Sequence, residues 1–110
     1  MDSVSLDDLA RTHLEQAREA HSGRSAHTLF GGQDHLLRQT LIALRAGEAL
    51  DEHESPGEAT LQVLQGRVRL VAGEDTGSGA TGDLLMIPDA RHSLEVDEDS
   101  VVLLTVAKRR

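Results

Sequence analysis

Hydrophobic positions near the start of the chain recur at the spacing of one face of a helix. The recurring positions are Leu6, Leu9, Ala10, His13, Leu14, Ala17 and Ala20. This i, i+3, i+4 spacing is typical of an amphipathic helix. Ser5 stands where a helix-capping residue is expected, with Asp8 three residues later, and Gly23 offers a C-terminal stop. The pattern predicts one short helix, which with its extension occupies residues 1–24.

After Gly23 the hydrophobic positions alternate with a period of two, as they do in half-buried strands. Glycine, proline or acidic turn residues separate the alternating runs, which lie at residues 25–30, 36–44, 59–64, 67–72, 83–87, 92–96 and 101–107. No helical segment long enough to cross between parallel strands lies between these runs. Residues 25–110 are therefore expected to form an all-β, antiparallel sandwich or small barrel.

The glycine-rich stretch from Gly73 to Gly82 leaves two interpretations open. Its glycine content is similar to that of a phosphate-binding loop. It lacks, however, the Gly-Lys-Ser/Thr ending and the following helix that such a loop requires. We therefore expect a hairpin loop here.

Composition excludes several classes of function. The 110 residues carry a formal net charge of -8 and a single aromatic residue, Phe30. A nucleic-acid surface needs clustered Lys and Arg, or a platform of aromatic side chains. The absence of cysteine excludes disulfides and thiolate metal sites, so any metal must be bound through nitrogen and oxygen ligands. The acidic N-terminus and the lack of a long apolar run predict a cytoplasmic protein without a membrane segment.

Two stretches of the chain each combine glycines with a histidine at a defined spacing. The first runs from Gly47 through His53 to Gly66, with Ser55 and Ala59 between. In the second stretch Gly82 precedes Pro88, Ala90, His92 and Val96. Together they resemble the paired motifs of the cupin superfamily, in which the first motif has two histidines and a glutamate and the second has one histidine. By this resemblance Ser55 and Ala59 replace two metal ligands, Ala90 replaces a glycine, His92 arrives one residue early and Val96 replaces an asparagine.

The resemblance implies a jelly-roll barrel, also called a double-stranded β-helix, whose interior contains the functional site. In metal-binding cupins this site binds a divalent ion such as iron, manganese, nickel or zinc. Of the four implied ligands only His53 and His92 remain, so a bound ion would be weakly held. Glu58, one residue before the implied carboxylate, could supply a third ligand only if the Pro56-Gly57 corner resets the strand register. Gly47, Gly66, Gly82 and Pro88 are expected at turns.

The alternative to a metal site is a metal-free polar cavity that binds a small organic ligand. The residues expected to line it, besides the two histidines, are Ser55, Ala59, Leu61, Val63, Leu94, Gln39 and Thr40. His13, His21, His27 and His35 are expected to be solvated or structural.

Three functions therefore stay open at this stage. The first is a small-molecule-binding cupin with a weakly held metal, and the second is a metal-dependent enzyme of dioxygenase, isomerase or decarboxylase type. The third is a structural or interaction module acting as a homodimer. A homodimer is expected in any case, because residues 101–107 are too hydrophobic on both faces for an exposed edge strand.

Overall fold

One helix precedes a series of strands in the computed structural model, which describes residues 1–55 and 57–108. The helix α1 spans Leu6–Glu19. The strands are β1 (Arg24–Phe30), β2 (Leu37–Leu44), β3 (Ala49–His53), β4 (Gly57–Gln65), β5 (Arg67–Ala72), β6 (Asp75–Ala80), β7 (Leu84–Ile87), β8 (His92–Val96) and β9 (Ser100–Lys108). The strand β1 thus starts at Arg24, the last residue of the segment expected to hold the helix and its extension.

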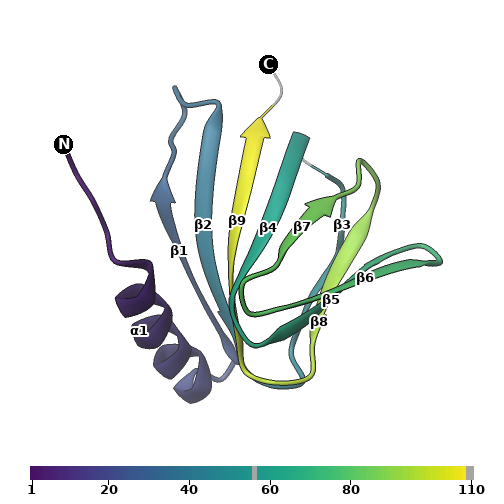
Figure 1. The fold of residues 1–110 in the computed structure, drawn as a ribbon, viewed down its shortest axis with the longest axis horizontal. Coiled ribbons are helices and arrows are strands. Elements are labelled where there is room, and N and C mark those ends of the chain that lie inside the picture. The colour runs from purple at the N-terminus through teal and green to yellow at the C-terminus, as the bar shows by residue number, and fades with distance from the viewer. Residues whose placement is uncertain (56, 109–110) are drawn as a thin grey trace.

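The strands form two antiparallel sheets that face each other (Figure 1). One sheet has the order β1-β2-β9-β4-β7 and the other has the order β3-β8-β5-β6. Every strand pairing among the described residues is antiparallel. The predicted class, an all-β antiparallel jelly roll preceded by a short helix, is confirmed.

Hydrophobic side chains from both sheets fill the space between them. Strict alternation sends every second residue of each strand inward, so one cluster collects side chains from β2, β4, β5, β8 and β9. Its buried members are Ile42, Leu44, Leu61, Val63, Val68, Leu70, Leu94, Val96 and Val102. This inner core positions the wall of the site described below.

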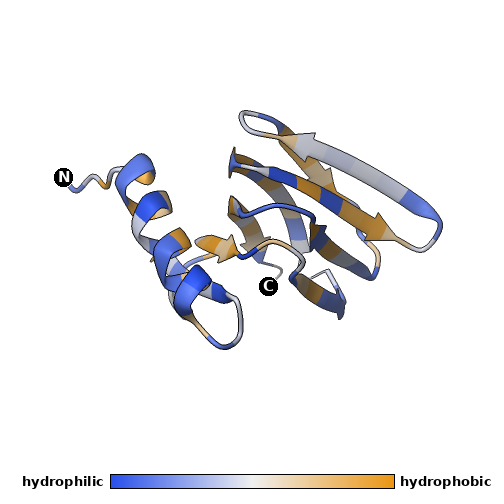
Figure 2. Cartoon of the chain, turned by 90° about the horizontal axis from the view of Figure 1, so that it is seen from below, coloured by the Kyte–Doolittle hydropathy of each residue, from blue (hydrophilic) through white to orange (hydrophobic). Residues whose placement is uncertain are grey.

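A second, smaller core lies under α1, on the outer face of the five-stranded sheet. It is formed by Ala10, Leu14, Ala17, Leu41, Ala43 and Val101. The Ser5 side chain accepts a hydrogen bond from the Asp8 amide at 3.2 Å, so the predicted N-cap is confirmed. The helix ends at Glu19, four residues before the expected glycine stop. Figure 2 shows α1 beside the strands with a largely hydrophilic exposed surface.

The hydrophobic C-terminal strand needs no partner subunit to cover it. β9 lies in the middle of the five-stranded sheet, between β2 and β4. One face contributes Val102 to the inner core and the other contributes Val101 to the core under α1. The reason given above for a homodimer therefore does not apply. A homodimer stays a prediction, which sedimentation equilibrium at tens of micromolar would test.

Two strands were not predicted from the sequence. β6 occupies Asp75–Ala80 inside the stretch expected to be a hairpin loop, and β3 occupies the charged segment Ala49–His53. Both strands lie at the edges of the four-stranded sheet, where few hydrophobic residues are needed. On β6, a Cβ atom added at Gly79 would come within 3.3 Å of the Leu85 side chain, so a small residue suits this close approach. The actual hairpin turn is shorter, at Gly73 and Glu74.

The residues expected at turns do lie between strands. Gly47, Gly66 and Gly82 have φ angles of 86°, 96° and 93°. An L-residue rarely adopts such angles, whereas glycine does so freely. At Gly66 an added Cβ would also collide with the Ser100 side chain and the Asp99 carbonyl. Pro88 directly follows β7. Within the described part of the chain, no helix has the length and apolar character needed to cross a membrane.

Candidate functional site

His53 and His92 lie opposite each other on neighbouring strands of the four-stranded sheet. They are register partners on β3 and β8. Their ring centroids are 4.5 Å apart, with an angle of 62° between the ring planes. His92 is buried, with 4% of its surface exposed, whereas His53 is exposed. The pair thus connects the barrel interior with its surface.

A β-bulge is what turns His53 inward. Leu50 on β3 pairs with Leu94, and His53 pairs with His92, so β3 has one more residue than β8 between these two pairs. In a regular strand, residues three apart point to opposite faces, but one extra residue restores them to the same face. Leu50 and His53 therefore both reach the cavity that His92 and Leu94 line. This bulge was not predictable from the motif spacing.

Both imidazole rings are held by the same kind of hydrogen bond. Nδ1 of His53 lies 2.9 Å from the Asp51 carbonyl oxygen, and Nδ1 of His92 lies 2.8 Å from the Ala90 carbonyl oxygen. A carbonyl can only accept, so Nδ1 must carry the proton in each ring. In the neutral imidazole this leaves a lone pair on Nε2. The two rings can therefore present two hydrogen-bond acceptors or two metal-ligating atoms.

A small hydrophobic cavity of about 50 Å³ adjoins the histidine pair. Apart from the two histidines its lining is entirely aliphatic: Ile42, Leu50, Leu61, Leu70, Ile87, Leu94 and Leu104. Of these residues the sequence analysis had named Leu61 and Leu94. Strand alternation could have identified Ile42, Leu70 and Leu104, but Leu50 lies on an unpredicted strand.

Charged side chains flank both histidines in the sequence and pair with one another. Arg91, next to His92, donates from Nε to Glu52 at 2.9 Å and from Nη1 to Glu54 at 3.2 Å. All three side chains are more than half exposed, so these pairs contribute little to stability. Arg91 and Glu54 are each adjacent in sequence to an inward-facing histidine, so alternation directs this charged cluster to the outer face of the sheet, the face that also carries Glu95.

No residue in the described part of the chain supplies a third ligand beside the histidines. Glu58 is exposed and lies next to Ala59 on β4, and alternation directs its side chain to the outer face, away from Leu61 and the cavity. The Ser55 hydroxyl donates to the Gly57 carbonyl at 2.7 Å. Among residues 1–55 and 57–108 no group of three His, Cys, Asp or Glu side chains could hold a metal ion. Two imidazoles fit a weakly held ion at most, because tight sites have three or more protein ligands.

Several residues expected to line the cavity lie elsewhere. Gln39 alternates to the helix side of β2 and donates to Thr105 at 3.2 Å. Thr40 shares a face with Ile42, but its hydroxyl lies 3.4 Å from that of Thr28, on the edge strand. Val63 is fully buried in the inner core, one inward position beyond Leu61. Ser55 and Ala59 lie at the end of the barrel and do not line this cavity, and Ala59 instead lines neighbouring surface hollows.

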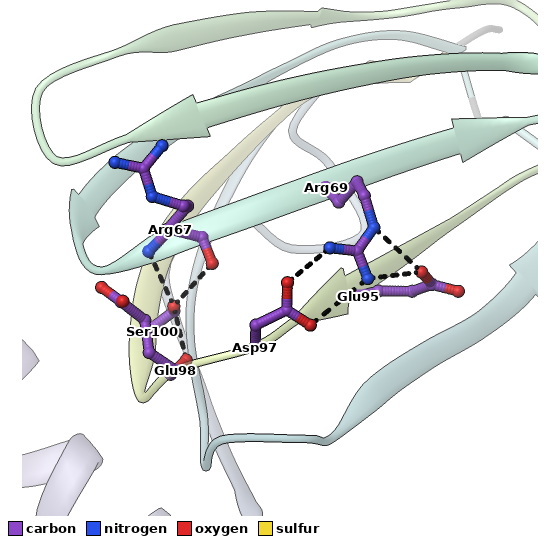
Figure 3. Close-up of polar contacts among 6 residues, drawn as sticks. All are labelled: Arg67, Arg69, Glu95, Asp97, Glu98 and Ser100. Atoms are coloured by element: carbon purple, nitrogen blue, oxygen red, sulfur yellow. Dashed lines mark hydrogen bonds and ion pairs between the residues drawn. The ribbon is translucent and has the colours of Figure 1, made fainter.

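The outer face of the four-stranded sheet carries a separate polar network (Figure 3). Arg69 donates to Asp97 at 2.6 Å and to Glu95 at 2.9 Å. Hydrogen bonds to Asp97 and Glu95 raise the pKa of Arg69 above its usual range, and Arg69 lowers the pKa of Asp97. The buried Ser100 hydroxyl bonds the backbone of Arg67. All these groups are partnered within the protein, so we assign the network a structural role.

Comparison with known proteins identifies the fold. No protein-family model matches the sequence, and no curated protein matches it either. Among solved structures, a conserved protein of unknown function from Streptococcus pyogenes is similar with a TM-score of 0.73 and 28% identity, covering 83% of this chain and 79% of that one. A cupin superfamily protein from Desulfitobacterium hafniense has a TM-score of 0.71 and 18% identity over 78% of each chain.

A larger enzyme also contains a similar domain. Salicylate 1,2-dioxygenase from Pseudoaminobacter salicylatoxidans has a TM-score of 0.74 and 20% identity, covering 92% of this chain but 31% of the enzyme. At these identities the similarity concerns the fold. The chain has the cupin fold, which is the fold that the resemblance noted in its sequence implied.

Proposed function

We propose that this small cupin domain binds a small molecule at the cavity beside His53 and His92. The observation that supports the proposal is the position of the two imidazoles, with each Nδ1 held by a backbone carbonyl at the edge of an aliphatic cavity. Binding sites of this kind combine apolar walls with a few polar groups that orient the ligand.

The size of the cavity limits what can enter it. Its volume of about 50 Å³ is well below that of drug-sized ligand sites, which measure roughly 300–1,000 Å³. Only a short apolar group fits without movement of the walls. The rest of the ligand would remain at the mouth, near the exposed His53.

A weakly held divalent ion is the second candidate ligand. Metal-ligating histidines typically donate their other ring nitrogen to a carbonyl or carboxylate, as both histidines do here. With two protein ligands, such an ion would be removed readily by a chelator and would contribute little to stability. Metal analysis of protein purified without a histidine tag, before and after chelation, tests this candidate.

A fragment screen followed by nuclear magnetic resonance tests the binding proposal. We expect amide shifts on β3 and β8 when a fragment binds. His53→Ala and His92→Ala should keep the fold and weaken binding, whereas His21→Ala, an exposed histidine outside the barrel, should not change it. A screen in which no fragment shifts β3 or β8 would contradict the proposed function.

A further inference from the structure

The cavity offers a ligand few hydrogen-bonding groups. Among the described residues that line it, the polar side chains are those of His53 and His92, and the Nδ1 atom of each is already bonded to a carbonyl. What remains for a ligand is one acceptor lone pair on each Nε2. The ring centroids are 4.5 Å apart, so one head group can reach both rings. A matching head group must donate at least two hydrogen bonds, which a simple alcohol or a carboxylate cannot do.

The segments that carry the two histidines have an excess of negative charge. Asp51, Glu52 and Glu54 lie on both sides of His53, and Arg91 supplies one positive charge that is shared between Glu52 and Glu54. The next hollow shares Ile87 with the cavity and is lined by Glu58 and Asp89 as well as Lys108. The Lys108 ammonium already donates to the Gly32 carbonyl at 3.0 Å. Carboxylates thus outnumber cationic groups on these segments, and the whole chain has a net charge of -8, so the long-range field favours a positively charged head group.

The walls and size of the cavity define the other end of the ligand. Seven aliphatic side chains surround the hollow, and its volume of about 50 Å³ exceeds the space that one water needs, which is about 10–15 Å³. A few carbon atoms would fill it. The ligand therefore combines a charged donor group at the mouth with a short alkyl group inside.

We propose that the ligand is a short aliphatic primary amine. Its ammonium group donates to Nε2 of His53 and of His92, and its alkyl group lies among Leu50, Leu61 and Leu94. The assignment rests on the proposed function of this site and names its ligand class. A lysine side chain does not match, because its ammonium would be at the mouth while its backbone would have to lie inside the cavity. The ligand is accordingly a free amine.

Four compounds of similar length test separately whether the positive charge and the hydrogen-bond donors of the ligand are required. n-Propylammonium has the positive charge and the donors, and N,N,N-trimethylpropylammonium has the charge alone. 1-Propanol has one donor and no charge, and propionate has the opposite charge. Isothermal titration or amide shifts on β3 and β8 should rank n-propylammonium first, by about tenfold over the trimethyl compound and 1-propanol, with propionate weakest.

Different outcomes of this titration would overturn the amine assignment and the proposed function. If 1-propanol or propionate binds as tightly as n-propylammonium at His53 and His92, the amine class is wrong while the binding site stands. Equal binding of the trimethyl compound would show that charge alone acts, which also overturns the assignment. If neither these compounds nor any screened fragment shifts β3 or β8, the proposed function itself fails.

Matched variants test the named contacts. His53→Leu and His92→Leu remove one acceptor each, so each should weaken n-propylammonium binding about tenfold and leave 1-propanol within about threefold. Leu50→Phe should fill the cavity and weaken every alkyl ligand. Glu54→Gln acts only through the long-range field, so it should weaken only the cation and by less than either histidine variant, compared with Glu19→Gln at the end of α1 as a control. Unchanged n-propylammonium affinity in both histidine variants would overturn the proposal, provided their amide spectra show the native fold.

Discussion

Two pairs of histidines lie in ring contact in this protein, and they differ in what surrounds them. His53 and His92 meet at 4.5 Å with rings at 62°, beside the aliphatic cavity. His13 on α1 and His27 on β1 are stacked at 5.5 Å with nearly parallel rings, at 14°. The second pair lies between the helix and the edge strand, and its residues line no cavity described for this structure.

The hydrogen bonds of the outer pair point to a structural role. Ser25 donates its hydroxyl proton to Gln16 at 3.0 Å, so Nδ1 of His13 must be the donor in its 2.7 Å contact with Ser25. Ser25 is therefore not activated as a nucleophile, despite its contact with a histidine. The chain of bonds fastens α1 to β1. The comparison shows that the cavity, rather than ring contact or a bonded Nδ1, distinguishes the candidate site.

The largest effects should come from the hydrophobic cores that support the two pairs. Leu14 under α1 and Leu61 on the cavity wall are each 3% exposed. Leu14→Ala and Leu61→Ala should each lower the free energy of unfolding by about 3 kcal/mol, measured by urea denaturation. Only Leu61→Ala should also enlarge the cavity and improve the binding of a longer alkyl ligand. Equal ligand affinities in the two variants would show that the cavity does not receive the ligand.

Adding the two ligands that the cupin motif lacks should give the His53–His92 pair a metal affinity that the His13–His27 pair does not have. Ser55→His combined with Ala59→Glu supplies two further ligands, and Ala59 shares the inward face of β4 with Leu61. Affinity for Zn²⁺ should rise by about a hundredfold, measured by competition with a chelating dye. The control combines Ser55→His with Thr60→Glu, because alternation places Thr60 on the outer face. An equal gain in the control would show that the inner geometry is not required.

Asp99 should make the attachment of α1 to the barrel less stable at low pH. Its carboxylate accepts from Arg18 at 2.6 Å and from the Ala46 amide at 2.8 Å, so it ties the end of α1 to the turn before β3. The Arg18 hydrogen bond and then the Ala46 hydrogen bond hold the pKa of Asp99 below its usual value of 3.8. The stabilisation is therefore present above the unfolded-state pKa and is lost as pH falls through the lower, folded-state pKa.

Asp99→Asn tests this pH dependence. The variant should lose about 1 kcal/mol of stability at pH 7, and its stability should fall less steeply than that of the parent protein below about pH 4. Asp97→Asn, which removes an exposed ion pair to Arg69, should have a smaller effect at neutral pH. If the free energy of unfolding fell equally steeply below about pH 4 in Asp99→Asn and in the parent protein, the role of Asp99 would be contradicted.

The sequence predicted those parts of the molecule that follow from periodicity. The helix, its Ser5 cap and seven of the described strands could be predicted because their hydrophobic positions repeat strictly. β3 and β6 could not, since edge strands rich in charge or glycine bury little. At the site, the family spacing identified His53 and His92. It could not reveal the β3 bulge, and thus missed Leu50. For Glu58, the alternation argument against an inward position agrees with its exposed position on β4.

The smallest effect should come from breaking the outer histidine pair. Ser25→Ala removes the acceptor of His13 and the donor to Gln16, but these side chains are half-buried or exposed and water can replace both bonds. We expect a loss of about 0.5–1 kcal/mol in the free energy of unfolding and unchanged binding at the cavity. His27→Ala should behave similarly, because it removes only a ring contact on the surface. Thermal unfolding combined with n-propylammonium titration measures both quantities on one sample. A loss of ligand affinity in Ser25→Ala would contradict the independence of the two pairs, because β1 lines no part of the cavity.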